Sequence, residues 1–258
     1  ETEEMPAFFT RRSGHKLDYR YDDPADIAKL MKTKWNLGID GGIVQPCITR
    51  PYLADAREAH DRIRRLCLAH PGRFWGMASL SPHYTPEDYY EEVRRCVREL
   101  GFVGVKLTPN GHAVDLMSRD ARTVYETARS LGIPVMVHTG MGIPFADPAR
   151  LYPLVRDYPG VKTVIAHAGS DFFTVQALQL AKAFDHVWLE PSGVGIEGIE
   201  GFLAELPPDK LMFSTDVPVQ AAGELLKYRR AVKSEAALEQ IFSKTAIQVF
   251  GLSPDGKQ

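Results

Sequence analysis

Short apolar runs rich in β-branched residues alternate with longer amphipathic stretches along most of this chain. In the amphipathic stretch 53–70, apolar side chains such as Ile63 and Leu66 recur at helical spacing among charged ones, and Pro71 with Gly72 ends the pattern. The run 74–80 that follows is almost continuously apolar. Such runs are typical of parallel strands that are buried on both faces.

The same alternation continues to the end of the chain and predicts a parallel sheet covered by helices. Successive strands begin roughly 30 residues apart, which is the length of a strand–helix unit. We expect strands at 41–46, 74–80, 102–107, 133–137, 161–166, 187–189 and 211–214, and helices at 24–34, 53–70, 85–100, 118–131, 147–157, 172–183, 196–205 and after residue 214. No linker or internal repeat interrupts the pattern, so residues 1–258 are predicted to form a single barrel domain.

The predicted strands number seven, whereas a closed (βα)8 TIM barrel, the α/β fold that this alternation favours, has eight. The helix at 24–34 needs a strand before it, so the missing first strand is expected upstream of residue 1. A seven-stranded version would leave two parallel edges without hydrogen-bond partners inside the layer of helices. The fold prediction is therefore a TIM barrel whose first strand lies outside this sequence.

Composition and charge narrow the class of protein. Hydrophobic residues make up 44% of the chain and charged residues 25%, which is ordinary for a globular protein with a buried core. The net charge of −2 favours neither nucleic acid nor an acidic membrane as a partner, and no apolar run is long enough for a membrane span. The cysteines, Cys47, Cys67 and Cys96, form no Cys-x-x-Cys pattern and indicate thiols in a reducing cytoplasm.

Three of the last four predicted strands end in a side chain that can bind a metal ion: His138, His167 and Asp216. Residues at the carboxyl ends of barrel strands face the active site, and neighbouring strands lie about 4.8 Å apart, so these side chains can converge. A single histidine at such a place is more often a hydrogen-bonded rim residue, and a single aspartate is more often a cap. The combination favours a metal-centred site, in which three protein ligands leave a position for water.

Four motifs in order carry a resemblance to a known family: Gly101-Phe-Val-Gly-Val-Lys-Leu107, Pro134-Val-Met-Val-His-Thr-Gly140, Val164-Ile-Ala-His-Ala-Gly169 and Leu211-Met-Phe-Ser-Thr-Asp-Val-Pro218. Together they resemble the amidohydrolase superfamily, over residues 23–250. The branch that looks most similar includes aminocarboxymuconate-semialdehyde decarboxylase, resorcylate decarboxylases and pyrone-dicarboxylate lactonase. The resemblance implies a distorted (βα)8 barrel with a divalent metal cofactor, for which we expect zinc first and manganese second.

The resemblance also implies a role for each strand-end residue. His138 would bind the metal ion from the fifth strand, and His167 would be a second ligand or would polarise the substrate and move protons. Asp216 would bind metal and accept a proton from the attacking water. The family's first-strand His-x-His pair, which supplies two more ligands, occurs nowhere in this sequence. Its absence coincides with the missing strand, so we expect both in a segment upstream of residue 1.

Four further residues near strand ends are predicted to contact substrate. Lys106 could bind substrate or the ligand network, or form a salt bridge at the rim, and His112 could contact substrate or be an exposed loop histidine. Glu190 and Ser192 either line the pocket or cap the next helix. Asp171 could orient His167, but a helix cap is the favoured assignment, and His60, His70, His83 and His186 are expected at the surface. Arg11, Arg12, His15 and Lys16 form a basic loop that could cover the site, although a solvated loop is favoured.

The sequence therefore predicts a cytoplasmic metal-dependent hydrolase that cleaves an ester, lactone or amide of a small organic acid. Asp216 would take a proton from the attacking water, and His167 would stabilise the oxyanion or shuttle protons. Non-oxidative decarboxylation of an aromatic or unsaturated acid at the same site is one alternative, and a metal-free barrel that acts as a binding protein is another. The expected partner is a small-molecule carboxylic acid derivative, and the family suggests a homodimer.

Overall fold

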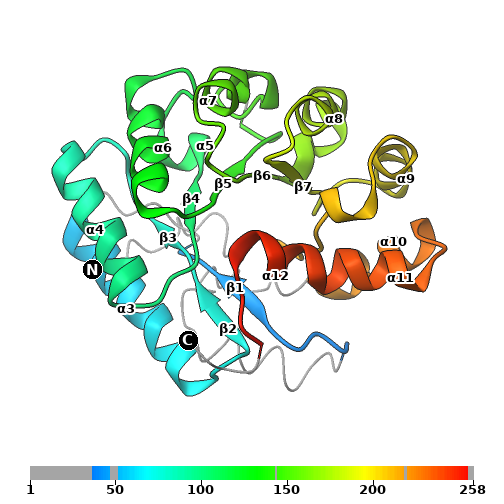
Figure 1. Cartoon of the computed structure of the whole chain (residues 1–258), viewed down its shortest axis with the longest axis horizontal. Coiled ribbons are helices and arrows are strands. Elements are labelled where there is room, and N and C mark those ends of the chain that lie inside the picture. The colour runs from blue at the N-terminus through cyan, green and yellow to red at the C-terminus, as the bar shows by residue number, and fades with distance from the viewer. Residues whose placement is uncertain (1–36, 47–51, 143, 218–219, 255–258) are drawn as a thin grey trace, which may run out of the picture.

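The strands of this protein are parallel and lie side by side, with most of the helices packed around them (Figure 1). The computed structural model describes residues 37–46, 52–142, 144–217 and 220–254. Strands β1 (Gly42–Val44) and β2 (Phe74–Gly76) form one parallel pair. Strands β3 (Ala78–Ser79), β4 (Val105–Leu107), β5 (Val135–His138), β6 (Thr163–Ala166) and β7 (Val187–Glu190) form a second sheet in that order.

The two sheets are one continuous layer, because β2 and β3 belong to a single extended stretch that is interrupted only at Met77. The amide of Met77 donates to Val44 on one side, and the amide of Ala78 donates to Gly104 on the other. At the far end, Leu211 forms a parallel bridge to Leu189 of β7. The predicted strand 211–214 is thus reduced to one bridge, and the predicted strand 74–80 carries two short strands.

Helices follow the strands in the predicted order, and the structure confirms the predicted α/β barrel class. The long helices are α3 (Leu53–Ala69), α4 (Pro86–Arg98), α6 (Arg119–Leu131), α8 (Thr174–Ala183), α9 (Ile196–Glu205) and α10 (Ala221–Ala231). The short ones are α5 (Pro109–His112), α7 (Tyr152–Asp157), α11 (Glu235–Glu239), α12 (Thr245–Phe250), the 3-10 helices η1 (Pro148–Leu151), η2 (His167–Phe172) and η3 (Pro208–Lys210), and the π-helix η5 (Gln240–Lys244). The predicted helix at 24–34 lies outside the described residues.

Local sequence signals explain where these helices begin. The hydroxyl of Thr85 accepts a hydrogen bond from the amide of Asp88, and the hydroxyl of Ser118 accepts one from the amide of Ala121. Both contacts satisfy amides that have no partner within the helix itself. In the described residues, no helix has the length and apolar character that crossing a membrane requires.

The core has two parts. The larger part lies between the strands and the surrounding helices, and includes Val105, Val135 and Leu189. The smaller part lies on the inner face of the curved sheet, where Met77, Val164 and Met212 pack against Val249 and Phe250 of α12. The Lys162 ammonium, one residue before β6, donates to the carbonyls of Gln248 and Val249. Helix α12 therefore closes the end of the barrel at which the strands begin, opposite the end that carries the candidate site.

Among the described residues, no strand lies between Leu211 and β1, where a closed barrel has its first strand. Amides alternate sides along a strand, so those of Phe213 and Ser79 point away from β7 and β4 respectively. The Phe213 amide donates to the carbonyl of Ile241 in the π-helix at 2.9 Å. The Ser79 amide donates to Nε2 of His60 on α3 at 3.1 Å. The π-helix and α3 thus satisfy these two amides, which have no acceptor on a described strand.

Candidate metal centre

The two predicted histidine ligands lie next to each other. His138 is the last residue of β5, and His167 directly follows β6, the neighbouring strand. Their ring centroids are 4.7 Å apart, with 68° between the ring planes. Because parallel strands bring their carboxyl ends to one edge, the sequence pattern alone was enough to predict this pairing.

A backbone carbonyl sets the protonation of the His138 ring. Nε2 lies 2.8 Å from the carbonyl oxygen of Met141. A carbonyl can only accept, so Nε2 carries the proton and Nδ1 keeps its lone pair. Burial lowers the pKa of His138, while the hydrogen bond to Met141 and, less strongly, the charge of Asp216 raise it.

The His167 ring is held through its other nitrogen. Nδ1 lies 2.9 Å from the hydroxyl oxygen of Ser192 and 3.3 Å from the carbonyl oxygen of the same residue. The carbonyl again can only accept, so Nδ1 carries the proton and Nε2 keeps its lone pair. Burial, with added effects of the charges of Lys106 and His138, lowers the pKa of His167 to about 3. Both rings are neutral at neutral pH, which is the form that binds a metal ion.

Asp216 is placed less closely. Its side chain is exposed, and its amide lies 3.2 Å from the hydroxyl of Ser214. The charge of Asp216 reaches His138, yet its carboxylate does not close a trio with the two histidines. Within the described ranges, one group of three histidine, cysteine or acidic side chains has ligand atoms all within 4.8 Å of one another, and it is a different group. The structure therefore brings the two histidines together, and the carboxylate of Asp216 lies farther from them.

Lys106 lies in the middle of the site rather than at its rim. It belongs to β4, is 5% exposed and pairs in register with Ser79 of β3 and Met136 of β5. Burial is the main cause of the lowered pKa values of His112, His138 and His167, and the ammonium of Lys106 lowers each further. The cation is thus close to every histidine of the site, and the rim position considered from the sequence is wrong.

His112 is buried, contrary to the expectation of an exposed loop histidine. It ends the short helix α5 and is 3% exposed. Its Nδ1 accepts a hydrogen bond from the amide of Thr108 at 3.1 Å, so Nε2 carries the proton. Burial lowers its pKa to about 4, with smaller effects from His83 and Lys106. A neutral ring with a donating Nε2–H is suited to bind an oxygen of a substrate.

Glu190 and Ser192 contact His167. The carboxylate of Glu190 accepts from the amide of Ser192 at 2.8 Å and from the amide of His167 at 3.3 Å. Burial raises the pKa of Glu190 to about 7, against the lowering effects of its hydrogen bonds to Ser192 and of Lys106. Both side chains are buried. Asp171, expected to cap its own helix, instead accepts from the amide of Gly195 at the start of α9.

Strained backbone is concentrated around these residues. Among the described residues, those other than glycine with positive φ are Ala113, His167, Ala168, Ser170 and Asp216. Four of the five are, or directly follow, predicted site residues: His167 and Asp216 themselves, Ala168 after His167, and Ala113 after His112. Such conformations are unfavourable and persist where the surroundings enforce them, often at functional sites. Residue types gave no sign of this strain.

The loops after β5 and β6 are in close contact. A Cβ atom on Gly140 would lie 2.3 Å from the hydroxyl oxygen of Ser170 and 2.7 Å from the carbonyl carbon of Gly169. The buried hydroxyl of Thr139 donates to Ala166 and accepts from the amide of Gly169, both at 2.8 Å. These contacts join the backbone after His138 to the backbone after His167.

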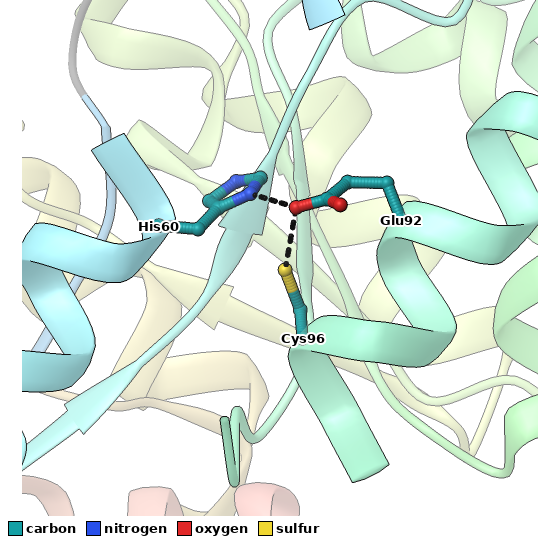
Figure 2. Close-up of side chains that lie close together, drawn as sticks. All are labelled: His60, Glu92 and Cys96. Carbon is teal, nitrogen blue, oxygen red and sulfur yellow. Dashed lines mark hydrogen bonds and ion pairs between the residues drawn. The ribbon is translucent and has the colours of Figure 1, made fainter. Parts of the chain in front are cut away.

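The three side chains whose ligand atoms all lie within 4.8 Å of one another are His60, Glu92 and Cys96, which are buried between α3 and α4 (Figure 2). The expectation that His60 is a surface residue is wrong. Nδ1 of His60 lies 2.8 Å from Glu92, while Nε2 accepts from the amide of Ser79. His60 Nδ1 must therefore carry a proton, because Nε2 is already an acceptor.

Three features exclude this trio as a metal centre in the observed arrangement. A metal ion on Nδ1 of His60 would need Nε2 to carry the proton, which would then face the amide of Ser79. The guanidinium groups of Arg57 and Arg95 already bind Glu92. Burial raises the pKa of the Cys96 thiol well above its usual range, which disfavours the thiolate that metal binding needs. The trio is a structural network that joins α3, α4 and β3.

A family comparison agrees with the fold. Residues 51–252 match the family model described as amidohydrolase. The chain belongs to the amidohydrolase family. This is the superfamily that the four motifs suggested, and the chain is an enzyme of the amidohydrolase type. The matched region begins at residue 51, later than the expected start of the resemblance at residue 23.

Solved structures of two decarboxylases and a hydratase share the fold at low sequence identity. A 2,6-dihydroxybenzoate decarboxylase from Rhizobium is 19% identical with a TM-score of 0.70, covering 92% of this chain and 89% of that chain. A 5-carboxyvanillate decarboxylase from Novosphingobium aromaticivorans, complexed with manganese, is 20% identical with a TM-score of 0.71, covering 88% and 80%. A 4-oxalomesaconate hydratase from Rhodopseudomonas palustris is 22% identical with a TM-score of 0.71, covering 93% and 85%.

The first part of the chain is similar to a different family. Residues 1–69 match the model of an indigoidine synthase A like protein. The pseudouridine-5'-phosphate glycosidase of Caldanaerobacter subterraneus is 60% identical over 43 residues, and that of Clostridium botulinum is 56% identical over 43 residues. The chain spans 14% of the length of each of these curated relatives. The two family matches overlap only at 51–69, so the expected amidohydrolase resemblance at 23–50 falls in the other match.

Proposed function

We propose that this amidohydrolase-type protein is a metal-dependent hydrolase that cleaves an ester, lactone or amide of a small carboxylic acid. The observation that carries the proposal is the pair formed by His138 and His167. Their rings are 4.7 Å apart, and each ring is held through one nitrogen by a backbone carbonyl. Metal-binding histidines are usually oriented in this way, with the second nitrogen donating to a carbonyl or carboxylate.

The donor set fits a divalent cation. Nδ1 of His138 and Nε2 of His167 would hold it, and the carboxylate of Asp216 would complete a set that zinc or manganese accepts. Manganese is present in the solved 5-carboxyvanillate decarboxylase. When bound, such an ion lowers the pKa of a coordinated water and so provides a nucleophile near neutral pH. Asp216, whose charge reaches His138, would take the proton of that water.

Two buried residues could donate to the acidic substrate. The ammonium of Lys106 on β4 and the Nε2–H of His112 at the end of α5 belong to buried residues, and the charge of Lys106 lowers the pKa of His112. A cation and a neutral N–H donor together can bind a carboxylate or a carbonyl oxygen. We assign Lys106 and His112 to substrate binding, and a small-molecule carboxylic acid derivative remains the proposed substrate. The homodimer and the cytoplasmic location stay predictions.

A second candidate function is non-oxidative decarboxylation at the same site. The likeness to dihydroxybenzoate and carboxyvanillate decarboxylases favours it, because one of those structures holds the aromatic acid 2,6-dihydroxybenzoate. An aromatic acid with a neighbouring hydroxyl group would present its carboxylate to the same donors. The two reactions differ in their products, since hydrolysis consumes water and decarboxylation releases carbon dioxide.

One experiment tests both candidates. The purified protein, loaded with zinc or with manganese, is incubated in 18O-labelled water with a panel of lactones, esters, amides and hydroxybenzoic acids. Hydrolysis predicts one 18O atom in the acid product and no carbon dioxide. Carbon dioxide release from a hydroxybenzoic acid, without 18O in the organic product, would replace the hydrolase proposal by the decarboxylase. Absence of turnover with either metal across the panel would contradict both and favour a binding protein.

A further inference from the structure

Three carboxylates bind the backbone of one short loop, residues 191–195, between β7 and α9. Glu190 accepts from the amide of Ser192 at 2.8 Å, Glu224 accepts from the amide of Gly193 at 3.1 Å, and Asp171 accepts from the amide of Gly195 at 2.8 Å. The acceptors come from three different elements: β7, α10 and the segment after β6. Hydrogen bonds from amides to ionised carboxylates are stronger than those between neutral groups, and three acceptors from separate elements hold the loop at three places.

Glu224 is the unusual member because it is far from the two histidines in sequence and is buried. It is 4% exposed, and its second oxygen, Oε2, has no hydrogen-bond partner among the described residues. Lys227, one turn later on α10, offsets the charge at 2.7 Å and also donates to the carbonyl of Val194 at 2.8 Å. A buried carboxylate is costly unless it is well bound, so this pair fixes Gly193 and Val194 against α10.

The loop held in this way carries the group that contacts His167. Glu190 binds the amide of Ser192 itself, and Glu224 binds the amide of the next residue, Gly193. The hydroxyl and carbonyl oxygens of Ser192 both face Nδ1 of His167. Glu190 also accepts from the backbone amide of His167. The same carboxylate therefore fixes the backbone of His167, which has a φ of 61°, and the loop that holds its ring.

We propose that the loop 191–195 is a preformed support that fixes the ring of His167 in the Nδ1–H tautomer and so leaves Nε2 free for the metal ion. Ser192, Glu190 and Glu224 are positioning residues in this account, and Ser192 and Glu190 are not substrate-binding residues. The metal-binding part rests on the proposed function. The tautomer itself is a property of the metal-free protein and can be measured without any substrate.

The test is the 15N spectrum of histidine side chains in the metal-free protein at pH 7, with His167 assigned by comparison with His167→Asn. The wild type is expected to show His167 with its proton on Nδ1. Ser192→Ala removes the shorter of the two acceptors of the Nδ1–H, and the remaining carbonyl at 3.3 Å favours the same tautomer more weakly, so a partial rise in the Nε2–H tautomer is expected. Ser130→Ala, which removes an exposed hydroxyl from α6, is the matched control and should leave the spectrum of His167 unchanged.

A second variant keeps the test decisive if Ser192→Ala does not fold. Glu224→Gln preserves the size of the side chain, removes the charge that binds Lys227 and Gly193, and should loosen Ser192 enough to give a smaller tautomer change. Zinc affinity should fall about 10- to 100-fold in Ser192→Ala, the range found when such a supporting hydrogen bond is lost. A wild-type His167 with the proton on Nε2, or a tautomer unchanged in both variants, would overturn the proposal. A shifted tautomer in a protein without hydrolase activity would support it and reject the proposed reaction alone.

Discussion

The rings of His138 and His167 lie side by side in opposite tautomers, because Met141 accepts from Nε2 of the first and Ser192 accepts from Nδ1 of the second. This arrangement leaves Nδ1 of His138 and Nε2 of His167 as electron-pair donors on neighbouring strands. Both rings are buried enough to stay neutral in the physiological range. The protein thus holds both rings, before any cation arrives, in the protonation state that binding a metal ion would require.

Lys106→Met is expected to impair substrate binding while leaving the metal content unchanged. The variant keeps the length of the side chain in the buried β4 position and removes the positive charge. Loss of a hydrogen bond to a charged group costs about 1.5–3 kcal/mol, so kcat/KM for an acidic substrate should fall about 10- to 100-fold. Steady-state kinetics with an acidic substrate and a neutral ester analogue provide the measurement. An equal loss for both substrates would contradict a role in binding the carboxylate.

Burial of the neutral His112 makes stability depend on pH. The folded pKa is about 4, below the usual 6.5, so the unfolded chain binds a proton first as the pH falls. The stabilising contribution is complete above about pH 6.5 and is lost progressively towards pH 4, by about 1.4 kcal/mol per pH unit. His112→Asn cannot take up this proton. The difference in unfolding free energy between wild type and variant, from urea titrations, should therefore shrink between pH 6.5 and pH 4, and a constant difference would contradict this.

Gly140→Ala should disturb the contact between the loops that carry His138 and His167. The position has a φ of 93°, and the added Cβ would meet the backbone carbonyl carbon of Gly169 at 2.7 Å. Strain of this kind costs about 1–3 kcal/mol or more. Gly160→Ala is the control, because that glycine has open space around it. Melting temperature and zinc affinity should both fall for Gly140→Ala only, and equal behaviour of the two variants would contradict the close contact.

His60→Ala should destabilise the protein strongly, because it leaves the amide of Ser79 and the carboxylate of Glu92 without this buried partner. Removal of one partner from a buried polar pair costs about 2–5 kcal/mol. His83→Ala removes a comparable histidine–carboxylate contact, to Asp120, at an exposed position, where about 1 kcal/mol or less is expected. Urea unfolding of the two variants gives the comparison. Similar losses would mean that the network in Figure 2 has no special structural role.

Much of the fold and half of the candidate site could be predicted from the sequence. Apolar runs that end in His138 and His167 identify strand ends, and parallel strands necessarily bring such ends together. The burial of His60 could have been predicted, because His60 has helical spacing with Ala56 and Ile63, which are both buried on α3. Amphipathic spacing places all three on one face.

Other features depend on contacts between distant segments and could not be predicted from residue types. The burial of His112, the tautomers set by Met141 and Ser192, and the contact of Glu224 with Gly193 arise only when the loops fold against one another. The order of strands and helices from residue 53 onwards was foreseen from the apolar pattern. The match of residues 1–69 to another family was not, because a helix signal such as Asp23 with Pro24 is shared by unrelated folds.

Metal content is the most direct test of the central claim, which is a cation bound by His138 and His167. The purified protein, dialysed against zinc or manganese and analysed by inductively coupled plasma mass spectrometry, is expected to carry about one ion per chain, as a three-ligand catalytic site holds. His138→Ala should lose that ion, while Cys96→Ala, which alters the other trio of potential ligands, should keep it. Metal content that is unchanged in His138→Ala, or lost in Cys96→Ala instead, would contradict the account.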